Sequence, residues 1–435
     1  MSNAQKTARE NVLSVVVDHK ERGGWSSEDI ADEMRELILS CGGKVVDQVI
    51  CPVETFTPSH LIGKGKVNEL FVRSSVGDID TVIFSEDLKG IQQRNLEKDL
   101  GVKVIDRTQL ILDIFARHAR TREGRMQVEL AQMEYLLPRL AGHGQTMSRP
   151  GGGIGTLGPG ETKLETDRRK IGIRIAHLKQ KLKDVVSNRS VKRKQRQERG
   201  VPVISLVGYT NAGKSTLLNA LTGARQITRD GLFTTLDSLS RQMVLPNHQK
   251  VVLSDTVGFM HNLPHDLIES FKATLEEVMQ ADLLLHVLDV SHPKFRDYYD
   301  SVNAVLKELG AGEKPVITVL NKIDRIDDRS WFAGVYGGIA NPVAVSASTG
   351  ENCDVLAHKI IEDLSGLLEE VDVLIPITRM DLINLAHKEG QVFSVKYYND
   401  TINLRASLTR KLAGLIKQAA VKNEDGPFKD DGTAK

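Results

Sequence analysis

The residues best suited to chemistry form the stretch GYTNAGKS at positions 208–215. It matches G-x-x-x-x-G-K-[ST], follows the apolar run VPVISLVG (201–208) and opens a run typical of a helix. In that setting backbone N–H groups surround phosphate oxygens, Lys214 neutralises the β- and γ-phosphates, and Ser215 is a ligand for Mg²⁺. The stretch therefore predicts a nucleotide-phosphate site made of Gly208, Tyr209, Thr210, Asn211, Ala212, Gly213, Lys214, Ser215 and Thr216.

Three further motifs follow in order, each at the end of an apolar run that predicts a strand. In DTVG (255–258), Asp255 can reach Mg²⁺ through water, and the Gly258 amide can meet a γ-phosphate. In NKID (321–324), Asp324 can accept hydrogen bonds from guanine N1–H and N2–H₂, donors that adenine lacks. The four motifs predict a GTP-binding domain of the translation-factor-related P-loop class.

The base pocket takes its residues from the last two motifs. Lys322 would lie along the base and Asn321 would brace the loop, while SAS (346–348) would close the pocket with the Ala347 amide toward guanine O6. The predicted base-binding residues are Asn321, Lys322, Asp324, Ser346, Ala347 and Ser348.

The catalytic arrangement departs from that of Ras-like enzymes. Thr235, in LFTTLDS, is the candidate threonine that closes on Mg²⁺ and the γ-phosphate, and Thr234 is the alternative. Ras-like enzymes carry a glutamine that orients the attacking water where this chain has Phe259. A phenyl ring cannot orient water by hydrogen bonding, so we expect slow intrinsic hydrolysis. The candidate catalytic residues are Lys214, Thr235, Gly258 and Asn211.

Asn211 has two interpretations that the sequence leaves open. An asparagine at this place resembles that of cation-dependent GTPases, in which its side-chain oxygen helps to hold K⁺ beside the phosphates. Alternatively, the side chain satisfies the backbone of its own loop. Mg²⁺, held by Ser215, Thr235 and, through water, Asp255, is the expected cofactor, and K⁺ is expected only under the first interpretation.

The elements that must position these residues alternate along the chain. Apolar runs at 201–208, 251–255, 283–290, 316–321 and 343–347 predict the buried strands of a doubly wound α/β domain over 200–369. Upstream, strand-like runs at 13–18, 44–50, 80–86 and 102–106 alternate with helix-like runs at 26–40, 66–75 and 91–101. This pattern predicts an N-terminal α/β domain with a largely parallel sheet over 1–105.

The segment 106–199 predicts a long antiparallel helical hairpin, which we call the arm. Its first helix repeats Met126, Leu130, Met133, Leu137 and Leu140, and its second repeats Ile171, Ile175, Leu178, Leu182 and Val185. Both spacings are those of coiled-coil seams. A helix over 161–199 would be about 58 Å long. A glycine-rich loop at 141–162 joins the two helices.

The remaining chain and the composition set broad limits. Residues 370–423 predict a small α+β domain and 424–435 a disordered polar tail. We find no secretory signal, no membrane-length apolar run and no zinc or disulfide pattern in three scattered cysteines, and therefore expect a cytoplasmic protein. Residues 163–199 carry 14 Lys/Arg against 4 Asp/Glu, whereas 1–100 carry 12 against 17, which indicates a polyanion-binding arm or a solvated helix face.

The glycine-rich loop contains GIGTLG (153–158), a literal G-x-G-x-x-G. A dinucleotide site needs a preceding strand and an acidic residue at a strand end about 20 residues on, and this stretch has neither. The glycines instead favour a thin loop that turns sharply and approaches RNA closely.

The arm and the GTPase motifs together resemble the HflX family of ribosome-associated GTPases. The resemblance rests on LIGKGKVNEL (61–70), QQRNLEKDL through MEYLLPRL (92–140), GGGIGTLGPGETKLETDRR (151–169) and GYTNAGKSTLLNAL (208–221). TLDS (235–238) and DTVGF (255–259) also match, and the C-terminal domain fits more loosely. Leu157 departs from the family pattern, in which we expect an arginine, and this change removes one phosphate contact at the loop tip.

The resemblance implies binding to the large ribosomal subunit, stimulation of GTP hydrolysis by it, and splitting or rescue of stalled ribosomes under stress. The basic arm agrees, since it can neutralise several rRNA phosphates. We expect a monomer that binds GTP and GDP and not DNA. The candidate RNA-binding residues are Arg149, Gly153, Gly155, Gly158, Lys163, Arg168, Arg169, Lys170, Arg174, Lys192, Arg193, Lys194 and Arg196.

Two other functions stay open at this stage. One is a regulatory GTP switch that acts on a protein effector. The other is an RNA-remodelling enzyme that also hydrolyses ATP through its N-terminal domain, an activity credited to some relatives of the family. Residues 1–100 contain no Walker-type loop, and GKGK (63–66) is more typical of a basic turn.

Overall fold

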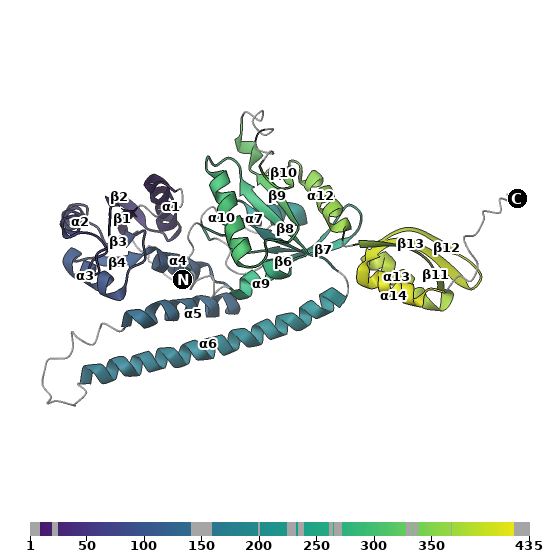
Figure 1. Cartoon of the computed structure of the whole chain (residues 1–435), viewed down its shortest axis with the longest axis horizontal. Helices are drawn as coiled ribbons and strands as arrows, with labels where there is room; N and C mark the ends of the chain where they lie inside the picture. The colour runs from purple at the N-terminus through teal and green to yellow at the C-terminus, as the bar shows by residue number, and fades with distance from the viewer. Residues whose placement is uncertain are drawn as a thin grey trace, which may run out of the picture. The chain divides into compact units, whose positions relative to one another are not determined.

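The computed structural model describes residues 9–19, 25–140, 159–198, 201–223, 232–233, 239–260, 264, 272–327, 334, 338–366 and 368–421 (Figure 1). Backbone contacts divide the chain into two compact units. One unit contains residues 1–186, 227–238 and 257–275, and the other contains 187–226, 239–256 and 276–435. Each unit is described by itself below.

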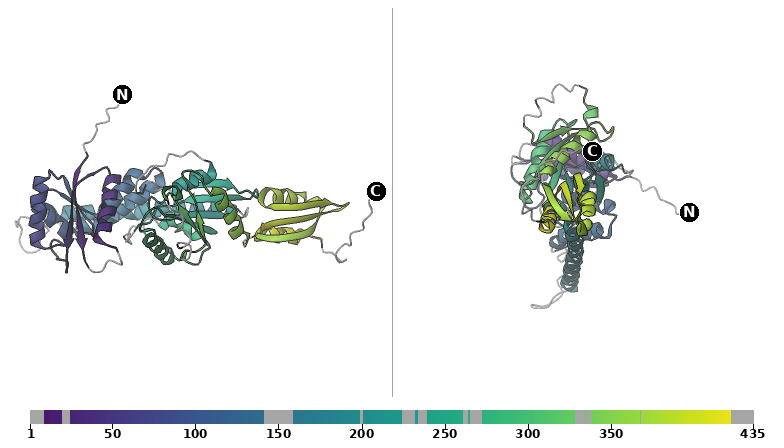
Figure 2. Two further views of the ribbon diagram at one scale, coloured as in Figure 1. Left: turned by 90° about the horizontal axis from the view of Figure 1, so that it is seen from above. Right: turned by 90° about the vertical axis from the view of Figure 1, so that its right-hand side faces the viewer.

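The N-terminal domain has the predicted parallel sheet, which lies between two pairs of helices. Its strands are β1 (Asn11–Asp18), β2 (Lys44–Pro52), β3 (Thr81–Phe84) and β4 (Lys103–Asp106), in the order β2-β1-β3-β4. The helices are α1 (Ser27–Ser40), α2 (Lys64–Val76), α3 (Gly90–Leu100) and α4 (Arg107–His118). Figure 2 shows this sheet nearly edge-on, with helices on both faces.

Local signals begin these elements where the sequence places them. Ser26 caps α1 through a capping box with Asp29, which satisfies two backbone donors of the first turn. On β1, the alternate residues Leu13, Val15 and Val17 pack in one core cluster with residues of α2 and α3. Successive side chains of a strand point to opposite faces of the sheet, so this cluster marks the face that α2 and α3 cover.

Helix α4 packs both on this sheet and on the arm. The predicted boundary at 105/106 placed it in the arm, but Leu110, Ile111, Ile114 and Phe115 are fully buried, and the helix packs against α1, β3 and β4 as well as against α5. The difference arises because α4 is apolar on more than one face, and sequence spacing alone does not show which partner each face meets.

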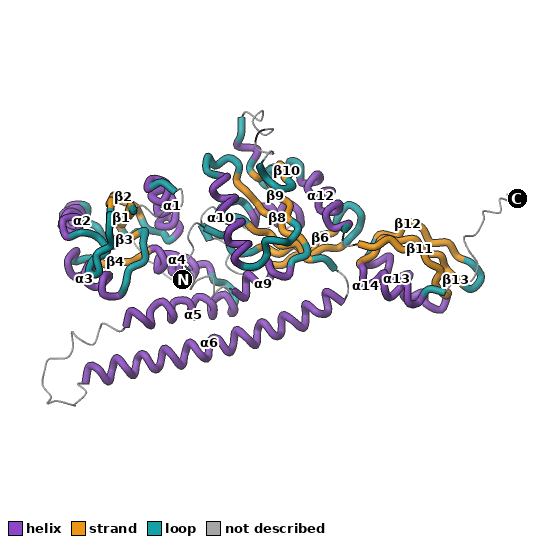
Figure 3. The backbone as a smooth tube through the Cα atoms, in the orientation of Figure 1, coloured by secondary structure: helices purple, strands orange, loops and turns teal. Residues whose placement is uncertain are grey.

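The arm consists of α5 (Arg122–Arg139) and α6 (Pro159–Glu198), which lie side by side in Figures 1 and 3. Leu130, Leu178 and Leu182 form its buried seam, with Met126 and Ile175 packed against them, so the central part of the predicted repeat is confirmed. Leu137 and Leu140 are only half-buried and lie outside that cluster. The 40 residues of α6 make a helix about 60 Å long.

The P-loop domain has the predicted doubly wound sheet with one additional strand. Its strands are β5 (Val203–Val207), β6 (Leu239–Val244), β7 (Lys250–Asp255), β8 (Leu283–Asp289), β9 (Val316–Asn321) and β10 (Pro342–Ala344), in the order β10-β9-β8-β5-β7-β6. Only β6 is antiparallel to its neighbour. This edge strand was not predicted, because it carries no buried apolar run: its side chains alternate between half-buried and exposed.

Helices cover both faces of this sheet. They are α7 (Lys214–Thr222), α9 (Lys272–Gln280), α10 (Phe295–Glu308) and α12 (Cys353–Ser365), with the short 3-10 helix η2 (Ile323–Arg325) after β9. Residues of α7 and α12 share one apolar cluster with alternate residues of β5, β8 and β9. The carboxyl ends of the parallel strands therefore meet at one edge, where the four motifs end.

The C-terminal domain is a three-stranded antiparallel sheet, in the order β11-β13-β12, with helices on one face. It comprises β11 (Leu368–Pro376), η3 (Ile377–Arg379), α13 (Met380–Glu389), β12 (Gln391–Tyr397), β13 (Thr401–Thr409) and α14 (Arg410–Ala419). This confirms the predicted α+β class, and the tail at 424–435 lies outside the described residues. Among the described residues no helix combines the length and apolar character needed to cross a bilayer.

Candidate functional site

Two glycines of the phosphate loop are required by its surroundings. The loop connects β5 to α7, and Gly208 and Gly213 both adopt positive φ, at 151° and 95°. A Cβ on Gly208 would lie 2.2 Å from the Val287 carbonyl oxygen on β8, and one on Gly213 would lie 2.3 Å from Asn321 Nδ2. Any side chain there would push the loop away from the strands that fix it.

Lys214 is held inside the loop. Its ammonium donates to the carbonyl oxygens of Gly208 and Tyr209 at 3.0 and 2.8 Å, and the residue is almost completely buried. Burial lowers the pKa of Lys214 to about 8, although Asp255 acts in the opposite direction. The ammonium therefore lies where loop amides and the N-terminus of α7 favour an anion, and it lacks the solvent that would stabilise its charge.

Ser215 and Asp255, the described candidate Mg²⁺ residues, lie side by side. The Ser215 hydroxyl donates to Asp255 Oδ2 at 2.6 Å, and Thr256 Oγ1 donates to the Leu206 carbonyl oxygen at 2.6 Å, which ties the end of β7 to β5. A hydroxyl and a carboxylate are the oxygen donors that Mg²⁺ prefers beside phosphates, so these residues fit the ion. Bound there, Mg²⁺ would neutralise negative charge on the phosphates.

The NKID residues are linked to the phosphate loop by two hydrogen bonds and to the SAS segment by one. Asn321 Nδ2 donates to the Ala212 carbonyl oxygen at 2.8 Å, and its Oδ1 accepts from the Ala347 amide at 3.0 Å. Lys322 donates to the Asn211 carbonyl oxygen at 2.8 Å. Asn321 thus braces the loop as predicted. The Ala347 amide, predicted to face guanine O6, is bound to Asn321, so contact with a base oxygen requires it to share that bond.

The surroundings of Asp324 favour its ionised form. The Ser346 hydroxyl donates to its Oδ1 at 2.6 Å, and this hydrogen bond lowers the pKa of Asp324 below its ordinary value. Ser346 also lies 3.0 Å from the Ser348 hydroxyl. The structure therefore brings together Asp324 and the SAS segment, the groups expected to read the guanine edge.

Asn211 has a backbone reason for its identity that the sequence analysis did not weigh. Its φ is 61°, in the left-handed region that asparagine tolerates better than most residues. The residue is exposed. Both interpretations of its side chain, as a ligand for K⁺ and as a partner of its own loop, stay predictions.

Three residues near the site were missed by the sequence analysis. Asp289, at the end of β8, lies 2.6 Å from Lys322 Nζ and orients that side chain. Tyr298 of α10 stacks on the predicted site residue Tyr209, with ring centroids 4.0 Å apart. His286 on β8 is fully buried, and neither ring nitrogen has a hydrogen-bond partner among the described residues. Burial and the Lys214 charge lower the pKa of His286 to about 3, so the ring is neutral. Only Asp289, a carboxylate at a strand end, gave a signal in the sequence.

The remaining candidate residues of the GTPase motifs are not described within this unit. Thr235 and Thr234 lie outside the described residues. Gly258 and Phe259 belong to the other compact unit, and only 3% of Phe259 is exposed, so its ring is packed in protein.

The candidate RNA-binding residues of the arm differ in their contacts. Arg168, Arg169 and Lys170 on α6 are exposed. Arg174 instead makes two hydrogen bonds to Glu129 of α5, at 2.7 and 2.9 Å, and so helps to hold the two helices together. Lys163, Lys192, Arg193, Lys194 and Arg196 lie on α6 with undescribed side chains, and Arg149, Gly153, Gly155, Leu157 and Gly158 lie outside the described residues.

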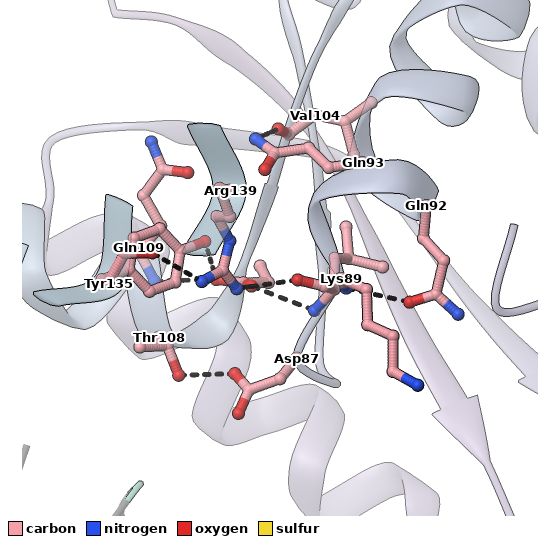
Figure 4. A network of polar contacts seen from close by, with 11 residues as sticks. Asp87, Lys89, Gln92, Gln93, Val104, Thr108, Gln109, Tyr135 and Arg139 are labelled. Atoms are coloured by element: carbon pink, nitrogen blue, oxygen red, sulfur yellow. Dashed lines mark hydrogen bonds and ion pairs between the residues drawn. The ribbon is translucent and has the colours of Figure 1, made fainter. Parts of the chain in front are cut away.

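A buried polar network fixes α5 to the N-terminal domain (Figure 4). Asp106, at the end of β4, accepts hydrogen bonds from the Leu88 and Gln109 amides, from the Tyr135 hydroxyl at 2.8 Å and from Arg139 at 2.9 Å. Burial raises the pKa of Asp106, and the amide donors and Arg139 oppose this. Burial also raises the pKa of Tyr135, which keeps its phenol protonated as a donor. Side chains of α5 therefore cover the carboxyl end of β4, at the edge of the sheet where parallel α/β domains commonly bind ligands.

Family models match consecutive parts of the chain. A model described as "GTP-binding GTPase N-terminal" matches residues 28–116, and "GTP-binding GTPase Middle Region" matches 118–196. "50S ribosome-binding GTPase" matches residues 203–322, and "HflX C-terminal domain" matches 336–422.

Similar proteins carry one name over most of their length. "GTPase HflX" of Caldanaerobacter subterraneus subsp. tengcongensis is 45% identical over 382 residues, which cover 88% of this chain and 88% of that protein. "GTPase HflX" of Escherichia coli is 42% identical over 350 residues, 80% of this chain and 82% of that one. A solved GTP-binding protein from Sulfolobus solfataricus in complex with GDP is 25% identical, covers 82% of this chain and 99% of that one, and has a TM-score of 0.43.

Proposed function

Because this chain belongs to the HflX family of GTPases, and so binds and hydrolyses GTP, we propose that it binds the large ribosomal subunit and splits or rescues stalled ribosomes under stress. The observation that carries the proposal is the exposed basic cluster Arg168, Arg169 and Lys170, which begins 10 residues after the glycine-rich stretch GIGTLG ends at 158. The description of the matched GTPase model as ribosome-binding supports the same partner. Such a protein would work in the cytoplasm.

We propose that GTP binds across the motifs that meet at the carboxyl edge of the P-loop sheet. Lys214 and the loop amides would hold the β- and γ-phosphates, Ser215 and Asp255 would hold Mg²⁺ with Thr235, and Asp324 would read the guanine N1–H and N2–H₂. Charge in the transition state of phosphoryl transfer is stabilised mainly by such positioned groups. Gly258 and, if K⁺ binds, Asn211 complete the proposed set.

The buried ring of Phe259 supports a slow intrinsic reaction. No side chain at that position can orient the attacking water by hydrogen bonding, so the partner has to supply what the chain lacks. Stimulation by the ribosomal subunit follows naturally from this.

The test is GTP turnover with and without purified large subunits, in the presence of Mg²⁺ and K⁺. We expect stimulation of at least tenfold, and no turnover by Lys214→Ala under either condition. A double variant, Arg168→Ala with Arg169→Ala, should keep the basal rate and lose most of the stimulation, since these side chains lie on the arm. Stimulation of less than about twofold would contradict the proposal.

One alternative is a regulatory switch that acts on a protein effector. It differs from our proposal in one readout, because such a switch would not co-sediment with large subunits at moderate salt in any nucleotide state. The exposed arm arginines favour a polyanion over a protein effector.

A further inference from the structure

Helix α10 contacts the phosphate loop through a pair of stacked aromatic rings. The ring of Tyr298 on α10 lies on the ring of Tyr209, with centroids 4.0 Å apart and planes 10° apart. Tyr209 is only 5% exposed, and Tyr298 is half-buried. On the other side, the Tyr298 hydroxyl lies 3.3 Å from Nε2 of His292, in the turn that leads into α10. The Tyr298 ring is therefore held both by the phosphate loop and by the turn before its own helix.

Tyr209 is the residue through which this stack reaches the phosphate site. Its carbonyl oxygen accepts hydrogen bonds from the Lys214 ammonium at 2.8 Å and from the Ala212 amide at 3.3 Å. Directly before it, Gly208 lies against the Val287 carbonyl oxygen of β8, where a Cβ would be only 2.2 Å away. The sheet thus fixes the backbone on one side of Tyr209, and α10 fixes its ring. Together they set the direction of the carbonyl group to which the Lys214 ammonium is bound.

We propose that Tyr298 is a positioning residue for nucleotide binding. By stacking on Tyr209, it holds the carbonyl oxygen that keeps the Lys214 ammonium in place for the β- and γ-phosphates. Tyr298 acts through the backbone of Tyr209 and not by contact with the nucleotide. This inference deepens the proposed function and rests on the proposed place of GTP in the P-loop domain.

The stack matters for binding because it favours one conformation of the loop before the nucleotide arrives. When a site is competent for only a fraction of the time, its apparent affinity falls by that fraction. A stacked aromatic pair stabilises one arrangement by a free energy that converts to roughly two- to twelvefold in an equilibrium constant. Ligands whose phosphates are held by Lys214 should therefore weaken by about that factor when the ring is removed.

The proposal also predicts which nucleotides respond. GDP and GTP carry the phosphates that Lys214 is expected to neutralise, whereas GMP carries only the α-phosphate. The affinity for GMP should therefore change little when the stack is lost. A general disruption of the P-loop domain would instead weaken all three nucleotides alike, because all three share the base.

The experiment uses the full chain with Tyr298→Leu, Tyr298→Phe and a matched control, Tyr398→Leu. Leucine keeps an apolar side chain on α10 without the ring, and phenylalanine keeps the ring without the hydroxyl. Tyr398 is 53% exposed in the turn between β12 and β13, so its replacement removes a tyrosine ring from the C-terminal domain. For each variant, titration calorimetry measures Kd for GMP, GDP and a non-hydrolysable GTP analogue with Mg²⁺. The urea midpoint of unfolding is measured without nucleotide.

We expect Tyr298→Leu to weaken GDP and the analogue about five- to tenfold and GMP less than about twofold. Tyr298→Phe should restore the affinity, and Tyr398→Leu should leave it unchanged. The proposal is overturned if Tyr298→Phe weakens GDP as much as Tyr298→Leu does, or if GMP weakens in parallel with GDP. A lower urea midpoint of Tyr298→Leu with an unchanged Kd for GDP would mean a purely structural role and would also overturn it.

A double-mutant cycle with Lys214→Ala tests the route of the effect. Because the stack is proposed to act through Lys214, Tyr298→Leu should cause little further loss of GDP affinity in a Lys214→Ala background. An undiminished loss there would overturn the proposal. The Lys214→Ala variant by itself tests the site: if it binds GDP like the unchanged protein, the proposed GTP site is wrong and the inference falls with it. If it weakens GDP while Tyr298→Leu does not, the site stands and only the positioning role is overturned.

Discussion

At the residue scale, Lys214 connects burial to ligand binding. Its ammonium is almost completely removed from water, donates to two carbonyl oxygens and lies near Asp255. The low pKa is the consequence, and a bound phosphate would reverse it by supplying negative charge at short range. The same lysine that neutralises phosphate is therefore sensitive to pH.

This sensitivity predicts a pH dependence of nucleotide affinity. Without phosphate, the pKa of about 8 means that Lys214 loses its proton near that pH. Phosphate binding favours the charged form, so binding takes up a proton above that pH. We expect the Kd for GDP to be constant at and below about pH 7 and to rise toward tenfold per pH unit above about 8. Titration calorimetry in buffers of different ionisation enthalpy measures the uptake. A profile that stays flat well above the pKa, or an equal slope in Lys214→Gln, would refute this assignment.

The lowered pKa of Lys214 also affects the stability of the folded chain, but in the opposite direction: stability rises with pH where nucleotide affinity falls. In the unfolded chain Lys214 keeps its proton up to its ordinary pKa of 10.5, so between about pH 8 and 10.5 the unfolded state binds more protons than the folded one. The contribution of this residue to stability without nucleotide therefore increases as pH rises through that range.

Asn211 gives a second prediction at this scale. If its exposed amide oxygen holds a cation beside the phosphates, GTP turnover in K⁺ should exceed turnover in Na⁺ by tenfold or more, and Asn211→Asp should change the ratio. Asn211→Gly is the matched control for the backbone, because glycine also adopts the φ of 61°. If turnover is the same in K⁺ and Na⁺, the left-handed backbone alone explains the asparagine.

At the scale of elements, the Asp106 network decides how α5 begins the arm. Asp106→Asn should remove the charge that pairs with Arg139, whose side chain is 18% exposed, and so leave a mostly buried guanidinium without its partner. We expect the N-terminal domain to lose about 3 kcal/mol of unfolding free energy. Urea unfolding followed by the buried Trp25 measures it, in a Trp331→Phe background that leaves one tryptophan.

Asp87→Asn is the control for that substitution. Asp87 is exposed and accepts only from the Thr108 hydroxyl in the same region (Figure 4). Asp87→Asn should lower the free energy of unfolding by less than about 1 kcal/mol. Equal losses in the two variants would show that the Asp106 network has no special role.

The arm itself makes a prediction about which arginines meet RNA. Arg168→Ala with Arg169→Ala should weaken binding to large-subunit RNA and reduce the salt slope of the binding constant by about one for each phosphate that is no longer neutralised. Arg174→Ala should change that slope less, because its guanidinium is already paired with Glu129. Filter binding between about 50 and 300 mM KCl measures the binding constant of each variant as a function of salt. A larger effect from Arg174→Ala would mean that RNA displaces Glu129.

At the scale of the whole molecule, the structure bears on whether the N-terminal domain holds a second nucleotide site, one that hydrolyses ATP. At the carboxyl edge of the N-terminal sheet, Tyr135 and Arg139 are bound to Asp106 at the end of β4. We therefore expect Lys214→Ala to abolish hydrolysis of both GTP and ATP, with all turnover assigned to the P-loop domain. ATP hydrolysis that survives in this variant, and persists through purification on two different columns, would instead place an ATPase in the N-terminal domain.

Features that depend on a few consecutive residues could be predicted from the sequence. The P-loop, DTVG, NKID and SAS each occupy a few consecutive residues after an apolar strand, so the carboxyl edge of the sheet could be predicted, together with Lys214, Ser215, Asp255 and Asp324. The seam of the arm could be predicted for the same reason, because heptad spacing records which side of a helix is buried. The alternating polar edge strand β6 gave no comparable signal and was missed.

The hydrogen bonds and ion pairs between different elements could be identified only from the tertiary structure. Asp106 with Arg139, Arg174 with Glu129, Lys322 with Asp289, and Leu232 with Ser40 join residues separated by 33 to 192 positions. Periodicity shows that a face is covered but not which side chain covers it, because a hydrogen bond depends on distances of a few ångströms between elements that local sequence does not specify. For that reason the sequence predicted a GTP site and a basic arm, whereas the stacking of Tyr298 on the phosphate loop became visible only in the folded chain.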